Sequence, residues 1–300
     1  MSTAPQLFDE TTRRKLEQVM LHASRVRAGA IKGERRSVKR GTSIEFADYR
    51  SYAPGDDLRR LDWNIYARTD RPLTKVYEDE EDLAVHLLLD ASASMDWTPD
   101  NGDAALNKFL YARRLLAGLG HVSLAENDRL VLSTLGSGAA VFGPVRGRSH
   151  GIGLLRYVGG LAARGTTDLN DALRAYALRA GRAGLAFVIS DFFSPTGYLD
   201  GMMALLAKGY EVAVLHVLSP YEVEPPLAGD LRLIDIETGT PQEISLDAGM
   251  RDLYIRRVRE WREDIRAECS KHGIHYVFTT TDIPWEKVIL YDLRRLGVVR

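Results

Sequence analysis

The stretch from Leu83 to Ser94 constrains the fold of this chain more than any other. An almost uninterrupted apolar run over 83–89 predicts a strand that is buried on both faces, as in a parallel sheet covered by helices. The run ends in Asp90, and Ser92 and Ser94 follow at alternate positions. Ligands of open α/β sheets bind where the strands end at their carboxyl edge. We therefore expect a doubly wound α/β fold with a polar site at the end of this strand.

The side chains at this strand end are suited to a hard divalent cation. Mg²⁺ takes oxygen ligands in proteins and keeps several waters. Residues 165–173 (Gly-Thr-Thr-Asp-Leu-Asn-Asp-Ala-Leu) place further hydroxyls and a carboxylate before an amphipathic helix, and 187–191 form a second buried strand that ends in an acid. These segments bring oxygen donors without thiolates or imidazoles, which favours Mg²⁺, Ca²⁺ or Mn²⁺ over zinc. The alternative is that Ser92 and Ser94 only cap a turn or the next helix.

Strands and helices alternate from Leu83 onward, which predicts a mostly parallel sheet with right-handed crossovers and helices on both faces. The expected strands are 83–90, 129–135, 139–143, 185–190, 211–217 and 274–278. The expected helices are 103–120, 149–159, 169–181, 197–208, 249–271 and 285–296. The short strand at 139–143 should pair antiparallel at one edge, and about 222–246 should form an inserted β-hairpin. We expect residues 1–78 to hold an N-terminal helix (12–31) and a signature module, and 79–300 to hold the α/β domain.

Composition excludes several classes of protein. The net charge of −1 gives no general argument for binding nucleic acid or an anionic membrane. The single cysteine, Cys269, excludes an internal disulfide and a cysteine-based zinc site. No apolar run approaches the roughly 18 residues of a membrane span, and the first residues lack the apolar core of a secretory signal. The expected location is the cytoplasm.

Residues 40–63 form a second unusual block, in which arginines and acids alternate with aromatic residues. The pattern predicts a strand-like segment, a Pro-Gly turn and a short helix capped by Asp56 or Asp57. Arg suits bidentate contacts with carboxylates, so buried ion pairs are expected here. The block is then either a salt-bridged plug against the sheet domain or an interaction surface. The aromatic residues of such a plug would be Phe46, Tyr52 and Trp63.

The strand-end motif resembles the metal-ion-dependent adhesion site of von Willebrand factor A domains. The likeness rests on Asp90-x-Ser92-x-Ser94, the Gly-Thr-Thr-Asp-Leu turn and Ser190-Asp191. It implies that a divalent cation, most often Mg²⁺, is the cofactor, and that an Asp or Glu of a protein partner completes its coordination. The implied metal ligands are Asp90, Ser92, Ser94, Thr167 and Asp191. Thr167 is preferred to Thr166 because the ligand of that family lies five residues before the Ala of an Ala-Leu pair, here Ala172-Leu173.

The block at 40–63 resembles the hallmark of a bacterial family called domain of unknown function 58. Each fixed position of the hallmark is present except an Ile, which Leu61 replaces. Members carry it ahead of a von Willebrand A-like, Rossmann-like domain, and the family often accompanies MoxR-type AAA+ ATPases. The resemblance thus implies a non-enzymatic adaptor that links such an ATPase to a client in protein assembly or maturation. Many members have two N-terminal membrane helices, and this chain resembles the soluble branch without them.

Other activities fit the sequence less well. A phosphatase of the haloacid dehalogenase type needs a second acid two residues after Asp90, where Ser92 stands. The chain has no Walker A loop or Gly-x-Ser-x-Gly elbow, so no catalytic residue is expected. His272 and His275 form at most an incomplete metal pair. A metal-dependent hydrolase using the same oxygen cluster stays open as an alternative, as does nucleic-acid binding through the basic stretch at 25–40, although that stretch lacks interleaved aromatics.

Overall fold

The computed structural model describes residues 7–23, 45–53, 61–78, 83–98, 103–136, 139–179, 181–226, 229–234 and 239–300. The chain forms two compact units, one made of Met1–Ala30 with Leu83–Arg300 and the other of Ile31–Asp82. This division differs from the expected boundary after residue 78. Helix α1 (Glu10–Leu16) groups with the sheet unit, because its residue Leu16 is fully buried in that core.

The larger unit is a mixed α/β structure around a six-stranded sheet of order β10-β7-β6-β3-β4-β5. Its strands are β3 (Ala84–Asp90), β4 (Arg129–Leu135), β5 (Val141–Val145), β6 (Leu185–Ser190), β7 (Glu211–Leu218) and β10 (His275–Thr280). Neighbouring strands are parallel except β4 and β5, which pair antiparallel at the edge as predicted. All of β3 is buried, so the expected doubly covered strand is confirmed.

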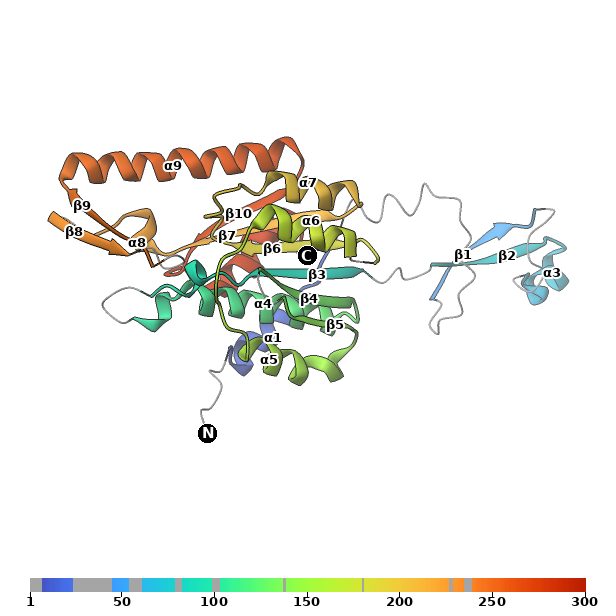
Figure 1. Ribbon diagram of the computed structural model, residues 1–300. Helices are drawn as coiled ribbons and strands as arrows, with labels where there is room; N and C mark the ends of the chain where they lie inside the picture. The colour runs from blue at the N-terminus through green and yellow to red at the C-terminus, as the bar shows by residue number, and fades with distance from the viewer. Residues whose placement is uncertain are drawn as a thin grey trace. The chain divides into compact units, whose positions relative to one another are not determined.

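Two helical layers cover the sheet (Figure 1). Alternate residues of β3 belong to different cores. Val85, Leu87 and Leu89 pack in the core shared with α4 (Lys108–Ala125) and α5 (Gly151–Gly159). Leu88 belongs instead to the core on the other face. The helices of that second layer are α6 (Leu169–Arg179), α7 (Leu199–Ala207) and α9 (Ala248–Lys271). This two-sided burial is the reason that the strands carry continuous apolar runs.

The N-terminal segment is shorter as a helix than its periodicity predicts. We expected a helix over 12–31, but α1 ends at Leu16, and the backbone of Met20 exchanges hydrogen bonds of 3.0 Å each with Arg300. Leu21 and Val299 form an antiparallel bridge. This pairing with the chain's last residues requires extended backbone and so stops the helix. The C-terminal segment itself holds α10 (Trp285–Lys287), a π-helical turn (Val288–Asp292) and α11 (Leu293–Arg295).

The predicted insertion is present as an antiparallel hairpin of β8 (Gly229–Ile234) and β9 (Pro241–Leu246). It follows the short helix α8 (Pro220–Val223), whose N-cap Ser219 forms a capping box with Glu222. In the part of the chain that the structure describes, no helix is long and apolar enough to cross a membrane.

The smaller unit contains an antiparallel pair, β1 (Glu45–Ser51) and β2 (Leu73–Glu78), and the helix α3 (Trp63–Thr69). The cap of α3 is Asp62, whose carboxylate accepts hydrogen bonds from the backbone N–H groups of Asn64 and Ile65 at 3.0 and 3.2 Å. Asp62 also accepts a bond from the Tyr49 hydroxyl at 3.0 Å. The predicted Pro-Gly turn and the caps at Asp56 or Asp57 lie outside the described residues.

Candidate functional site

Asp90 is the last residue of the central strand β3, and its carboxylate is 5% exposed. One oxygen accepts the backbone N–H of Ser92 at 3.0 Å. The other accepts the Ser190 hydroxyl at 2.7 Å, because parallel pairing of β3 with β6 brings the two strand ends together. Each carboxylate oxygen has a second lone pair, so both keep the capacity to bind a cation.

Ser92 and Ser94 lie on the turn that follows β3, where the chain enters a 3₁₀ helix (Ala93–Asp96). Their hydroxyl oxygens are 2.9 Å apart. Ser92 is the N-cap residue of that short helix, but its side chain makes no capping bond. Ser92 therefore does not cap this helix through its side chain. Ser92 is buried, whereas Ser94 is partly exposed, so the pair reaches from the interior toward the surface.

Thr167 comes from a loop that lies against the same strand end. Backbone bonds of 2.7 Å from Arg164 to Ala91 and of 2.8 Å from Ala93 to Gly165 fasten this loop to the turn after β3. Thr167 is 9% exposed, and its hydroxyl is buried without a hydrogen-bond partner. A Cβ at Gly136, directly after β4, would collide with this hydroxyl. A buried polar atom without a partner is costly, so Thr167 has capacity for a ligand.

Asp191 follows strand β6 and is 1% exposed. One of its oxygens accepts the backbone N–H of Phe193 at 3.1 Å. The other accepts a bond from the ammonium of Lys108 at 2.7 Å. Lys108 is the first residue of α4 and has no exposed surface, and it also donates to Glu222 at 2.6 Å.

Sequence reasoning missed Lys108 and Glu222. Lys108 is 83 residues from Asp191 and 114 residues from Glu222 along the chain, so no local spacing connects the three. Locally, the sequence marks only the start of α4, through the N-cap Asn107, whose side-chain oxygen accepts the Leu110 N–H at 2.7 Å.

The electrostatics of the strand end reflect buried charge. Burial, and then the neighbouring charge of Asp191, raise the pKa of Asp90 above its usual value. Burial alone would lower the pKa of Lys108, but the charges of Asp191 and Glu222 outweigh it and raise that pKa, so the lysine stays protonated. Asp90 has no such cation at hydrogen-bond distance among the contacts described above. A positive ion near Asp90 would therefore relieve its repulsion with Asp191.

These residues fit a hard cation. The structure brings Asp90, Ser92, Ser94, Thr167 and Asp191 to one edge of the sheet, and they could supply two carboxylates and three hydroxyls. The unpaired Thr167 oxygen and the buried charge of Asp90 are the observations that favour this fit. Within the described ranges, no three His, Cys, Asp or Glu side chains form a group that could hold a metal ion.

The histidines named from the sequence do not form a metal pair. His275 contacts Glu211 at 3.0 Å, and His272 contacts Glu268 at 3.5 Å. A different imidazole, His216 on β7, lies close to the site but is fully buried and bonded to the Tyr276 hydroxyl at 2.8 Å. Burial lowers the pKa of His216 to about 3. Aromatic rings pack against it, namely Phe192, Trp261, Tyr276 and Phe278.

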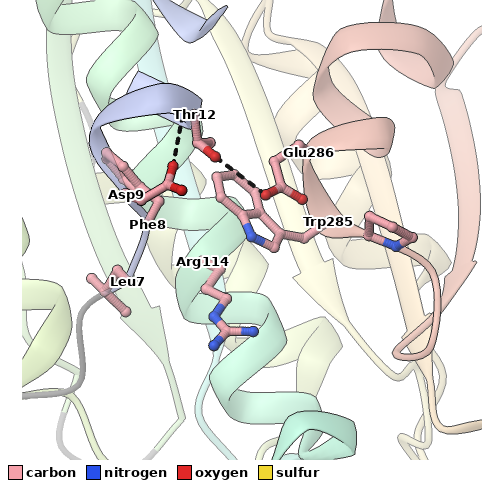
Figure 2. A pocket seen from close by; sticks show the side chains of 8 residues that line it. Leu7, Phe8, Asp9, Thr12, Arg114, Trp285 and Glu286 are labelled. Carbon is pink, nitrogen blue, oxygen red and sulfur yellow. Dashed lines mark hydrogen bonds between the residues drawn. The ribbon is translucent and has the colours of Figure 1, made fainter. Parts of the chain in front are cut away.

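A hollow of about 400 Å³ lies between α1, α4 and α10, and Figure 2 shows its lining side chains. Three of its polar residues are joined by hydrogen bonds: Asp9 accepts the Thr12 N–H at 2.7 Å, and the Thr12 hydroxyl donates to Glu286 at 3.4 Å (Figure 2). The Phe8 and Trp285 rings pack 5.9 Å apart. The hollow marks where the N-terminal segment packs on the rest of the unit, and it shares no residue with the strand-end cluster.

The model of the family described as "Protein of unknown function DUF58" matches residues 48–264. The chain belongs to the DUF58 family. The match begins within the block at 40–63 and includes the strand-end residues from Asp90 to Asp191.

Relatives of this DUF58 chain include uncharacterized proteins of mycobacteria. Mb1516 of Mycobacterium bovis is 31% identical over 263 residues, which is 86% of this chain and 81% of the relative. Rv1480 of Mycobacterium tuberculosis shows the same identity and coverage, 31% over 263 residues. MAV169 of Mycobacterium avium is 34% identical over 118 residues, 39% of this chain and 69% of that protein.

Solved structures resemble the DUF58 chain only distantly. The conserved hypothetical protein BatB of Bacteroides thetaiotaomicron is 18% identical, with a TM-score of 0.44 over 72% of this chain and 98% of that one. An aerotolerance-related membrane protein of Bacteroides fragilis, carrying multiple mutations to serines, is 20% identical, with a TM-score of 0.43 over 71% of this chain and 99% of that one.

Proposed function

We propose that this DUF58 chain is a non-enzymatic, divalent-metal-dependent protein-binding module of the von Willebrand factor A type. Its cation, most suitably Mg²⁺, would be held by the five strand-end residues Asp90, Ser92, Ser94, Thr167 and Asp191. The observation that carries this proposal is the buried Thr167 hydroxyl without a partner, beside two buried carboxylates. Hydroxyls and carboxylates of this kind are the donors that Mg²⁺ and Ca²⁺ prefer.

The donor set also suggests how a partner binds. Two carboxylates only neutralise a divalent ion, and the remaining donors are neutral, so the ion keeps an open position that a further carboxylate can fill. Ser94 is partly exposed and gives access from the surface. The partner would therefore present an Asp or Glu on a protruding loop or helix end. A hydrolase would need a general base beside the ion, and His216 is enclosed by aromatic rings and fully buried.

We further propose that the partner is a MoxR-type AAA+ ATPase or its client, and that the chain acts as an adaptor in protein assembly or maturation in the cytoplasm. Membership in DUF58 supports this part through the association that the family resemblance implies. The chain has no Walker A loop, so hydrolysis of ATP would belong to the partner.

Titration calorimetry with MgCl₂ tests the metal site. The double variant Asp90→Ala/Ser92→Ala should lose the binding heat while its circular dichroism stays that of the wild type, and Thr167→Ala should bind more weakly. Ser149→Ala is the matched control, because Ser149 lies on the separate 3₁₀ turn Arg148–His150. Equal Mg²⁺ affinity in wild type and double variant would refute the assignment.

The partner is tested by co-purification with the MoxR-type ATPase of the same organism. Binding should require Mg²⁺, fail with a chelator, and weaken in Asp191→Ala and Thr167→Ala. A complex that forms equally well in chelator, and with both variants, would mean that the cation plays no part in recognition.

A further inference from the structure

Lys108 places a fixed positive charge inside the proposed metal site. Its side chain has no exposed surface, and its ammonium lies 2.7 Å from Asp191 and 2.6 Å from Glu222. The ammonium also lies 5.4 Å from the centre of the Phe193 ring. A buried ammonium must remain paired, because an uncompensated charge in the protein interior is strongly unfavourable. Asp191 would therefore interact with two cations, Lys108 and the proposed divalent ion.

Glu222 allows the lysine to stay paired when Asp191 is engaged elsewhere. Its second oxygen accepts the Ser219 N–H at 2.7 Å in the capping box of α8. Its backbone carbonyl accepts the Tyr254 hydroxyl at 2.8 Å, which ties α8 to α9. Glu222 is therefore held in place independently of Lys108, and it can keep one carboxylate on the lysine whatever happens at Asp191.

We propose that Lys108 is a resident competitor of the divalent cation: it neutralises Asp191 when no metal is bound, and it keeps Glu222 as partner when metal is bound. This inference rests on the proposed metal-dependent function. The consequence is a low affinity for the metal alone, because the incoming ion shares Asp191 with a positive charge that cannot leave. A partner carboxylate then supplies the missing negative charge, so metal and partner bind together.

Calorimetry with MgCl₂ at neutral pH tests this competition. Lys108→Met should bind Mg²⁺ at least tenfold more tightly than wild type. Glu222→Gln should bind at least threefold more weakly, since Asp191 is then the lysine's only carboxylate. Lys208→Met makes the same substitution at an exposed position, the C-cap of α7, and should leave the affinity unchanged.

The double variant Lys108→Met/Glu222→Gln tests the same competition if Lys108→Met alone fails to fold. It removes one positive and one negative charge, so the net charge of the site equals that of the wild type. Mg²⁺ binding at least threefold tighter than wild type would then reflect the release of Asp191 and not a change in net charge.

The outcomes separate this inference from the proposed function. If wild type binds Mg²⁺ but Lys108→Met and the double variant bind no more tightly, the competition is refuted and the metal site stands. If Glu222→Gln binds as well as wild type or better, the role of Glu222 as the lysine's second partner is refuted. If wild type and all variants bind no Mg²⁺, the proposed metal site falls, and the competition falls with it.

Discussion

The two ends of the central sheet differ in how their buried polar and charged side chains are paired. Near the amino end, two histidines have polar partners: His86 on β3 contacts the Tyr176 hydroxyl at 2.7 Å and the Arg182 carbonyl at 3.0 Å, and His275 contacts Glu211. At the carboxyl end, two carboxylates, Asp191 and Glu222, share one lysine, the neighbouring carboxylate of Asp90 is buried, and the Thr167 hydroxyl has no partner.

This difference indicates which end of the sheet has polar groups available to bind a ligand. A matched polar pair contributes to stability and has little left to offer a ligand. An excess of buried negative charge and an unsatisfied oxygen cost stability unless something binds there. Both ends belong to the same six strands, so the contrast comes from the side chains at the strand ends and not from the architecture.

The largest expected effect comes from removing the shared cation at the carboxyl end. Lys108→Met should lower the free energy of unfolding by about 3–5 kcal/mol in the absence of metal, because it leaves buried carboxylates uncompensated. At the amino end, His275→Gln removes one partly exposed partner and should cost about 1 kcal/mol. Urea denaturation of both variants, with and without Mg²⁺, measures the contrast. Equal losses would mean that the two ends are not different in kind.

A smaller effect concerns pH at the amino end. Burial lowers the pKa of His86 from 6.5 to about 4. Above pH 6.5 the imidazole is neutral in both folded and unfolded chains and adds no pH dependence. Between pH 6.5 and 4 the unfolded chain binds a proton that the folded chain excludes, so the free energy of unfolding should fall with decreasing pH, by roughly 3 kcal/mol in total.

His86→Asn should flatten this part of the pH profile of unfolding, although it is less stable at pH 7. His150→Asn is the control, because His150 is exposed, and it should keep the wild-type slope. A His86→Asn profile as steep as that of the wild type would show that other groups carry the acid sensitivity.

The smallest expected effect distinguishes two glycines that share a left-handed backbone. Gly136 has φ of 104° and Gly297 has φ of 75°. An added Cβ at Gly136 would meet the Thr167 hydroxyl, whereas at Gly297 it meets nothing within 4 Å. Gly297→Ala should cost about 1 kcal/mol for the backbone alone, and Gly136→Ala about 2 kcal/mol. Only Gly136→Ala should also weaken Mg²⁺ binding, and equal Mg²⁺ affinity in the two variants would place Thr167 outside the site.

Much of the fold could be predicted from the sequence because its strands are continuous apolar runs that end in turn signals. β4 and β6 have the bounds that were predicted, and the antiparallel edge strand was correctly expected. The helix expected over 12–31 was wrong between Glu17 and residue 23, because its periodicity could not reveal the pairing of Leu21 with Val299, and residues 24–31 lie outside the described part of the chain.

The candidate site was only half predictable. Residues within one strand end, such as Asp90 and Ser92, are linked by local spacing, so their proximity follows from the sequence. Lys108 comes from the start of a helix and meets Glu222 from a capping box 114 residues away. Such a contact depends on how α4 and α8 lie across the sheet edge, and no spacing in the sequence encodes it. Whether the five residues bind a metal stays a prediction.

The β-bridge between Leu21 and Val299 has a consequence for how the protein folds during its synthesis on the ribosome. The segment with Phe8, Leu16 and Leu21 is synthesised well before Trp285 and Val299, against which it packs. Residues 31–82, the smaller unit, interrupt the sequence of the larger unit between these two segments. The apolar residues of the N-terminal segment therefore stay partly uncovered during synthesis until the segment with Trp285 and Val299 has emerged. A chain stalled or cleaved before that point would expose them to chaperones and proteases.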